Sequence, residues 1–216
     1  MTANDLPETS GPTCIDHPLA KAALSRLRES GTGTEAFRSN ARLLSRVLAL
    51  HVLDDLRLTE SEIETPLEKT TGYEVTESVI FVPVLRAGLA MLDAMSDMVP
   101  GSRVGFVGLE RDEQTAIARS YYEKLPDQLA SSEVIVLDPM LATGGSAIAT
   151  LDLLKKHSAT RLRLACIVAA PEGLEALRAE HPDVRVFTAS IDRALNEKKY
   201  ILPGLGDFGD RYFGTD

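Results

Sequence analysis

Cysteine and histidine are scarce in this 216-residue chain, and tryptophan is absent. The two cysteines, Cys14 and Cys166, are far apart in the sequence and lack the spacing of metal ligands, which argues against a disulfide framework or a zinc site. Cys166 lies in an apolar run, so we expect it to be a small buried residue. This cysteine usage favours a reducing, cytoplasmic setting.

The chain also lacks a dense basic cluster, and its net charge is −9, which argues against nucleic-acid binding as its main role. An acidic protein can still bind an anion where a few arginines and backbone dipoles meet in one cleft. No apolar run is long enough to span a bilayer, so we expect no membrane partner. Residues 1–14 read as a disordered tail without a signal peptide, and residues 15–216 as one domain.

Strand-like and helical segments alternate from residue 79 onward. The predicted strands are residues 79–84, 103–109, 121–124, 134–137, 164–169 and 184–188, and the predicted helices are residues 18–28, 35–56, 89–98, 172–180 and one after residue 146. Residues 61–76 are expected to form an arm with Ile63 and Val75 as apolar anchors. This pattern predicts an α/β fold whose mostly parallel sheet is flanked by helices, after an N-terminal helical part.

The most informative stretch is residues 134–146, where an apolar strand leads through small residues into a helix. Pro139 ends the strand, and the small residues let successive N–H groups face one anion at the start of the helix. Thr143 and Ser146 can add hydroxyl donors, and Asp138 can accept from two sugar hydroxyls. The alternative is a tight turn in which Thr143 or Ser146 merely caps the helix.

Three other segments carry candidate chemistry. Arg86 follows a predicted strand and can fork onto a diphosphate, although such an arginine can also form a surface ion pair. The polar residues 111–120, called the hood below, read as a mobile lid or as a solvated loop. Residues 200–214, called the base loop, contain four glycines among apolar and aromatic residues, which favours an ordered loop over a disordered tail. Bare backbone there can read the edge of a flat base.

These segments together resemble the uracil phosphoribosyltransferase branch of the type I phosphoribosyltransferases. The resemblance covers residues 15–215 and rests on residues 17–19, 31–35, 82–88, 110–115, 121–126, 138–146 and 201–214. Most branches carry two adjacent acids where this chain has Asp138 followed by Pro139, and the C-terminal block is the most specific part. Some members carry a small residue where Phe208 stands, which affects the expected pocket shape but not a main-chain contact.

The resemblance implies a site residue by residue. It assigns catalytic roles to Arg86, Arg111 and Asp207, of which the two arginines neutralise the leaving diphosphate. Contacts to phosphoribosyl diphosphate (PRPP) are expected from Arg86, Arg111, Asp138, Pro139, Met140, Leu141, Ala142, Thr143, Gly144, Gly145, Ser146 and Asp207. Contacts to uracil are expected from Ile201, Gly206, Asp207 and Phe208.

The implied reaction converts uracil and PRPP into UMP and diphosphate, with Mg²⁺ carried mainly on substrate oxygens and no dedicated protein ligands. The resemblance also implies a homodimer or higher homo-oligomer, and GTP as a candidate effector. Two rival functions stay open at this point. One is a phosphoribosyltransferase for another base, which the C-terminal block argues against. The other is an RNA-binding regulator on the same fold, which the acidic charge and the intact base loop disfavour.

Overall fold

The structure, a computed structural model, describes residues 11–111 and 118–215. Its centre is a nine-stranded sheet with the order β1-β11-β10-β8-β4-β6-β7, in which β5 also pairs with β4 and β9 with β10. The strands are β1 (Thr13–Cys14), β4 (Val79–Leu85), β5 (Arg103–Val104), β6 (Phe106–Arg111), β7 (Ala118–Lys124), β8 (Glu133–Leu137), β9 (Met140–Leu141), β10 (Arg161–Ala169) and β11 (Arg185–Ile191). The pairings are parallel apart from the antiparallel β6–β7 hairpin, which confirms the expected α/β fold.

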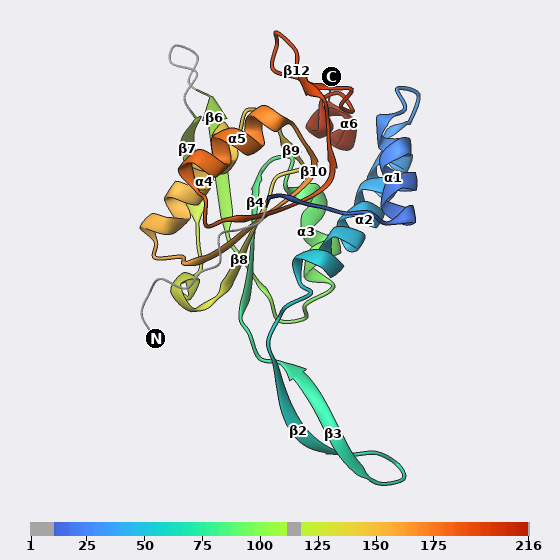
Figure 1. The fold of residues 1–216 in the computed structure, drawn as a ribbon, viewed down its shortest axis with the longest axis vertical. Helices are drawn as coiled ribbons and strands as arrows, with labels where there is room; N and C mark the ends of the chain where they lie inside the picture. The colour runs from blue at the N-terminus through green and yellow to red at the C-terminus, as the bar shows by residue number, and fades with distance from the viewer. Residues whose placement is uncertain (1–10, 112–117, 216) are drawn as a thin grey trace.

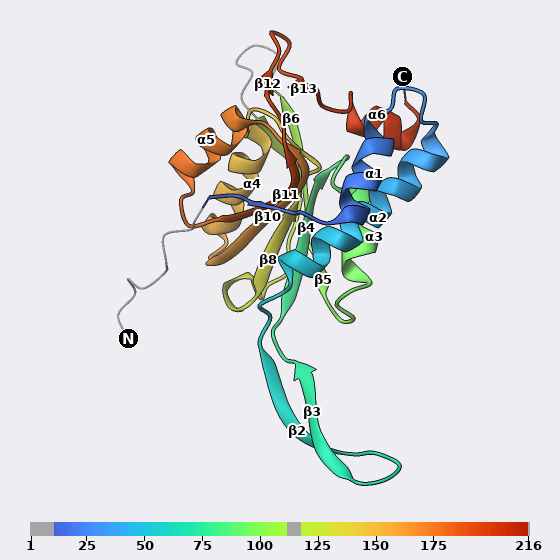
Figure 2. The same cartoon turned by 45° about the vertical axis from the view of Figure 1, so that its right-hand side comes forward.

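Helices cover both faces of this sheet (Figure 1). The helices are α1 (Pro18–Arg28), α2 (Thr34–Val52), α3 (Leu89–Ser96), α4 (Gly145–Lys156), α5 (Pro171–Glu180) and α6 (Phe208–Phe213). Figure 2 shows α4 and α5 on one face and α1, α2 and α3 on the other, with α6 beside α1. Among the described residues, no helix is both long and apolar enough to cross a membrane.

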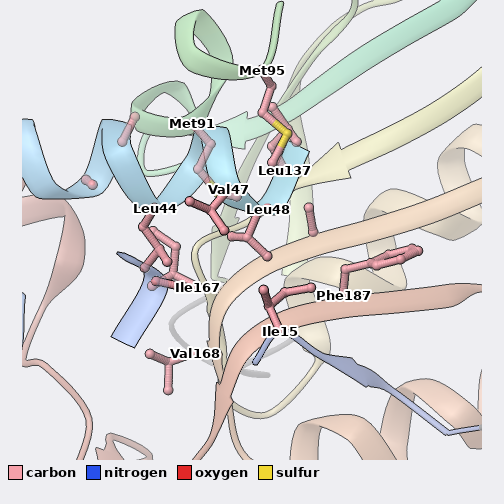
Figure 3. Close-up of a cluster of buried hydrophobic side chains, with 14 of the residues drawn as sticks. Ile15, Leu44, Val47, Leu48, Met91, Met95, Leu137, Ile167, Val168 and Phe187 are labelled. Atoms are coloured by element: carbon pink, nitrogen blue, oxygen red, sulfur yellow. The ribbon is translucent and has the colours of Figure 1, made fainter. Parts of the chain in front are cut away.

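The alternation of side chains along each central strand explains the two helical layers. In β4, Phe81 packs in the cluster with α1, α2 and α3, whereas Ile80 and Val82 pack in the cluster with α4 and α5. Successive strand residues point to opposite faces, so a strand covered on both sides is apolar throughout. Figure 3 shows the first cluster, where Leu44 and Leu48 of α2 lie among apolar side chains from the sheet.

The arm predicted for residues 61–76 is a two-stranded antiparallel hairpin of β2 (Leu58–Glu64) and β3 (Lys69–Val75) that extends away from the body (Figure 1). Its expected anchors are not buried within this chain, because Ile63 is 44% exposed and Val75 is 50% exposed. The prediction of two apolar anchors is therefore wrong for the single chain. Within the described residues, both side chains lie on a hairpin that extends from the body and leaves each about half exposed.

Two other boundaries differ from the sequence-based expectation. Thr13 and Cys14, which we placed in the disordered tail, form β1 and pair in parallel with Phe187 and Thr188 of β11, while residues 1–10 lie outside the described part. The predicted loop of residues 111–120 is wrong at both ends, because Arg111 belongs to β6 and residues 118–120 belong to β7. Residues 112–117 lie outside the described residues.

Candidate active site

The carboxyl ends of β4 and β8 meet because a glycine allows it. A Cβ atom on Gly88 would lie 2.3 Å from the carbonyl oxygen of Leu137 and 2.6 Å from the amide nitrogen of Val84. No side chain fits in that space, so Gly88 lets the turn that carries Arg86 lie against the end of β8. The peptide bond between Leu85 and Arg86 is cis, a feature that the sequence did not suggest.

The turn into α4 has the form of an anion cradle. Gly144 is the N-cap residue of α4, with φ +85°, and its cap position has no side-chain hydrogen bond. The alternative of a turn capped by Thr143 or Ser146 therefore does not fit the described structure. Gly173 of α5 permits the loop to pass closely, since a Cβ there would lie 2.4 Å from the carbonyl oxygen of Ala142. The free N–H groups at the start of α4 suit a phosphate.

Asp138 stands directly after β8, half-buried at the strand end. Burial raises the pKa of its carboxyl to about 6, while a hydrogen bond of 3.4 Å from the backbone N–H of Met140 works in the opposite direction. A carboxylate whose ionised form is this poorly solvated gains from any added donor, such as a pair of sugar hydroxyls. Its position and its pKa both suit a ligand-binding role.

Arg86 projects from the same end of the sheet, and its side chain is 63% exposed. Its guanidinium lies 3.9 Å from Asp210 and 5.9 Å from the ring centroid of Phe213, so it faces the C-terminal helix α6. An ion pair this long and exposed contributes little to stability. The guanidinium therefore remains available to bind an anion.

A pocket of about 220 Å³ joins the cradle to the base loop. The base loop begins with β13 (Ile201–Leu202), which pairs with β12 (Ala194–Leu195), and ends in α6. The pocket is lined by Ala87 of the Arg86 turn, by Met140 and Ala142 of the cradle, and by Lys199, Tyr200, Ile201, Gly206, Asp207, Phe208 and Gly209. Every residue that the sequence assigned to uracil thus lines one pocket, together with Met140 and Ala142, which were assigned to PRPP, and Asp207 was assigned to both substrates.

Phe208 reaches this pocket without filling it with its ring. The ring is buried, stacks on Tyr212 at 5.9 Å and meets the edge of Phe37 in α2 at 5.2 Å between centroids. Phe208 therefore anchors α6 to the body through its ring contacts. Asp207 precedes it as the N-cap of α6 and accepts a hydrogen bond of 2.9 Å from the N–H of Asp210.

For one of the residues that the sequence assigned to the site, the structure does not describe the side chain. Arg111 ends β6, and its side chain lies outside the described part of the structure, as does the charged stretch that follows it. The roles of Arg111 and of the hood stay predictions. Conversely, the sequence analysis missed Arg28 and Asp192, which form an ion pair of 2.6 Å against the base loop. Their separation of 164 residues leaves no local pattern by which the pair could have been found.

The comparisons with known proteins point to the same class. A hypoxanthine phosphoribosyltransferase from Trypanosoma cruzi superposes with a TM-score of 0.51 at 11% identity, covering 73% of this chain and 75% of that chain, a likeness that shows the fold alone. A solved structure from Aquifex aeolicus superposes with a TM-score of 0.88 at 37% identity, covering 94% of this chain and 98% of that one. The fold with its strand-end cradle is that of a type I phosphoribosyltransferase.

Sequence comparison defines the family within that class. The profile of the uracil phosphoribosyltransferases matches residues 14–215. A uracil phosphoribosyltransferase from Salinibacter ruber is 49% identical over 203 residues, which cover 94% of this chain and 97% of the relative. Another, from Malacoplasma penetrans, is 45% identical over 93% of this chain and 98% of the relative. This chain belongs to the uracil phosphoribosyltransferase family.

Proposed function

We propose that the protein transfers the 5-phosphoribosyl group of PRPP to uracil and releases UMP and diphosphate, with residues 15–216 acting as one catalytic domain. The observation that carries this proposal is the shared pocket, in which Ile201, Gly206 and Asp207 of the base loop face Met140 and Ala142 of the cradle. A base and a ribose phosphate must meet at one point for the glycosidic bond to form. The family membership and the names of the curated relatives support the same activity.

The base would be read by backbone groups of the base loop. Gly206 has φ +82° and no side chain, and the Phe208 ring packs against Phe37, so backbone groups of this stretch are the ones we propose for contact with the base. A backbone N–H facing O4 and a backbone carbonyl facing N3–H suit uracil. Cytosine would place an amino group and a bare nitrogen against the same partners, and each unsatisfied buried group costs about 1–3 kcal/mol.

On the PRPP side, Asp138 would accept hydrogen bonds from the ribose hydroxyls, and residues 139–146 would hold the 5′-phosphate at the N-terminus of α4. Arg86 and Arg111 would stabilise the negative charge that grows on the diphosphate as its bond to C1′ breaks. The bond from C1′ to uracil N1 then forms, and the N1 proton is released. The protein's contribution is mainly position and charge, since this transfer needs no covalent intermediate.

Mg²⁺ is the cofactor that we propose for this site. In residues 11–111 and 118–215, no cluster of three or more potential metal-binding side chains is present, and the pocket end of the sheet offers the separate carboxylates Asp138 and Asp207. Such a donor set fits an ion that arrives on substrate oxygens and keeps several waters. Its chemistry would be to neutralise phosphate charge, with either carboxylate as the available protein contact.

Product analysis tests the proposed activity directly. Purified protein is incubated with labelled uracil and PRPP, and we expect labelled UMP that disappears when Mg²⁺ is omitted. Labelled cytosine, guanine and hypoxanthine serve as competing bases. Product from another base at a similar rate, or the lack of any nucleotide from uracil, would overturn the proposal. A low-salt binding assay against pyrimidine-operon leader RNA tests the regulator alternative.

We also propose a homodimer or a higher homo-oligomer. The arm carries exposed apolar side chains, including Leu67 at 95% exposure and Tyr73 at 61%, and a cavity of about 550 Å³ lies at its base, lined partly by Leu50, Val75 and Met98. Apolar side chains exposed together on one element are typical of an interface. Light scattering after size exclusion measures the mass, and a monomer at micromolar concentration would contradict this proposal.

Two further expectations come from the family resemblance and have their own tests. GTP is proposed as an effector, and a titration at limiting PRPP would reveal it as a change in rate at fixed uracil; an unchanged rate would exclude it. The cytoplasm is proposed as the working compartment, in keeping with the free thiols of Cys14 and Cys166. Cell fractionation with a tagged protein tests that location.

A further inference from the structure

Both backbone groups of Gly204, in the base loop, are held by charged side chains from distant parts of the chain. Its N–H donates to Asp192 Oδ2 at 2.8 Å, and its carbonyl oxygen accepts from Arg28 Nη1 at 2.8 Å. Arg28 also donates to both carboxylate oxygens of Asp192, at 2.7 and 2.6 Å. The three residues form a closed ring of hydrogen bonds that joins the end of α1, the end of β11 and the base loop.

This ring is built to be rigid. The side chain of Asp192 is 3% exposed and that of Arg28 is 24% exposed. Burial alone would raise the pKa of Asp192, but hydrogen bonds from Arg28, Ser190 and Gly204 outweigh it and hold that pKa below its usual value. Charge-assisted hydrogen bonds between a guanidinium fork and a carboxylate fix orientation as well as distance.

The backbone at Gly204 accepts no other residue in this conformation. Gly204 has φ +59°, and a Cβ atom there would lie 2.2 Å from the carbonyl oxygen of Ile201. The next carbonyl, that of Leu205, accepts from Arg211 Nη1 at 2.6 Å, and Arg211 Nη2 donates to the carbonyl of Glu29 at 2.6 Å. The stretch immediately before Gly206 is therefore tied twice to the C-terminal end of α1.

We propose that Arg28 and Asp192 are positioning residues for base recognition, which set the direction of the Gly206 and Asp207 backbone groups by fixing the peptide groups of Gly204. They do not line the pocket, so they act through the loop and not on the substrate. This proposal rests on the proposed uracil transfer. Under this proposal, a residue at the end of α1, which is far from the cradle in sequence, helps to determine how selectively the base is bound.

The test compares Arg28→Lys with Arg26→Lys. Arg26 lies on the same helical turn and pairs with exposed Glu29 at 3.0 Å, so its substitution is a matched control that leaves the base loop untouched. Lysine keeps the charge at position 28 but cannot bond the carboxylate and the Gly204 carbonyl in the same fork geometry. We expect the KM for uracil to rise about tenfold or more, since small misplacements of a binding group are costly, with the KM for PRPP changed less than about twofold.

Asp192→Asn is the second variant, because it removes the charge while keeping the size of the side chain. We expect the same selective rise in the KM for uracil and a smaller preference for uracil over cytosine. Equal changes in both KM values, or changes no larger than those of Arg26→Lys, would overturn the positioning role.

Amide hydrogen exchange at Leu205 and Gly206 separates this proposal from the proposed function, since it needs no turnover. Arg28→Lys should speed exchange at these amides relative to Arg26→Lys, and unchanged exchange would overturn the proposal by itself. If the wild-type protein forms no UMP, the proposed function fails and the base-recognition role falls with it. The amide exchange rates would then still show whether the hydrogen bonds among Arg28, Asp192 and Gly204 hold the base loop in place.

Discussion

The two ends of the central sheet use charge in opposite ways. At the amino ends of the strands, charged side chains are paired: buried Arg163 bonds buried Glu133 at 3.0 Å and also reaches the more exposed Asp55, which pairs with Arg185 as well. At the carboxyl ends, Arg86 is 63% exposed and lies 3.9 Å from Asp210, while burial disfavours the ionised form of Asp138. The amino ends satisfy these charges within the protein, whereas Arg86 and Asp138, at the carboxyl ends of β4 and β8, are left to be satisfied by a ligand.

That difference separates stability from binding. A buried ion pair that loses one partner leaves an uncompensated charge, whereas an exposed arginine can be removed at little cost to the fold. Removing a paired charge at the amino edge should therefore lower the melting temperature, whereas removing the exposed charge of Arg86 at the carboxyl edge should change the kinetics. The variants below test this division from the largest expected effect to the smallest.

Gly88→Ala should have the largest effect, because it forces apart the two strand ends that make the site. The new methyl group would collide with the Leu137 carbonyl at 2.3 Å, a backbone contact that cannot move aside. We expect a loss of stability above about 4 kcal/mol together with loss of activity. Gly31→Ala is the control, since nothing lies within 4 Å of a Cβ there. Urea denaturation of both variants measures the difference, and similar midpoints would contradict the close approach at Gly88.

Arg163→Ala should follow, with a loss of stability of about 3–5 kcal/mol, because it breaks the buried pair with Glu133 and leaves Glu133 with Arg161 and Asp55 with Arg185 as their remaining ion-pair partners. Calorimetry should show this as a fall in Tm of roughly 6–20 °C for a chain of this size. Well below its Tm, the variant should keep the wild-type KM for both substrates, because the amino edge is remote from the pocket. A changed KM with an unchanged Tm would contradict the proposed role of the amino edge in stability and not in binding.

Arg86→Ala should have the opposite profile, with a large loss of activity and little loss of stability. We expect kcat to fall about 10²–10³-fold, the usual loss when one group that stabilises transition-state charge is removed. Its free energy of unfolding should change by no more than about 0.5 kcal/mol, since the side chain is exposed and weakly paired. Single-turnover rates and thermal melts on the same sample give both numbers. A stability loss as large as that of Arg163→Ala would show that Arg86 is structural.

Asp138→Asn comes last because it should cause no loss of stability, but a gain that depends on pH. The folded pKa of about 6 is higher than the usual value of 3.8, so the folded protein binds the proton more tightly than the unfolded chain. The wild type therefore loses stability as the pH rises through 6. Without ligand, the neutral variant should be more stable at pH 8 by on the order of 1–3 kcal/mol, and this gain should shrink towards pH 5.

The same substitution should act in the opposite direction on function, because asparagine lacks the charge that accepts from the ribose hydroxyls. We expect weaker PRPP binding by the variant at pH 8, and wild-type turnover that rises as the pH increases through about 6, where Asp138 ionises. Melting curves and PRPP titrations at pH 5 and pH 8 check both directions. If the variant is less stable than the wild type at pH 8, burial does not raise the pKa of Asp138 as described.

The local patterns of the sequence predicted most of this fold and the cradle. The stripe of Phe37, Leu44 and Leu48 is fully buried, and the loop of small residues before α4 has the expected form. Such features depend on neighbours within a few residues, and periodicity therefore reveals them. The base loop was also predicted to be ordered, and it contains β13 and α6.

Features that depend on distant partners could not be predicted. The apolar Ile63 and Val75 suggested anchors, but periodicity does not show whether a hairpin folds back on its own body. The ring of Phe208 packs against Phe37 because α2 lies next to α6 in the fold. The pairing of Thr13 with Phe187 needs an open edge of the sheet at β11. In each case the deciding contact spans many residues and leaves no trace in the nearby sequence.

The link between Arg28 and Gly204 also has a consequence for the order in which the protein becomes active. The two residues are 176 positions apart, so ribosomal synthesis delivers one long before the other. The elements that build the cradle all precede residue 181, since β9 pairs with β10 and Gly173 of α5 lies against the Ala142 carbonyl. The base pocket closes only when the segment after residue 200 has left the ribosome and returned to α1. A nascent chain can therefore acquire a phosphate cradle well before it can accept a base.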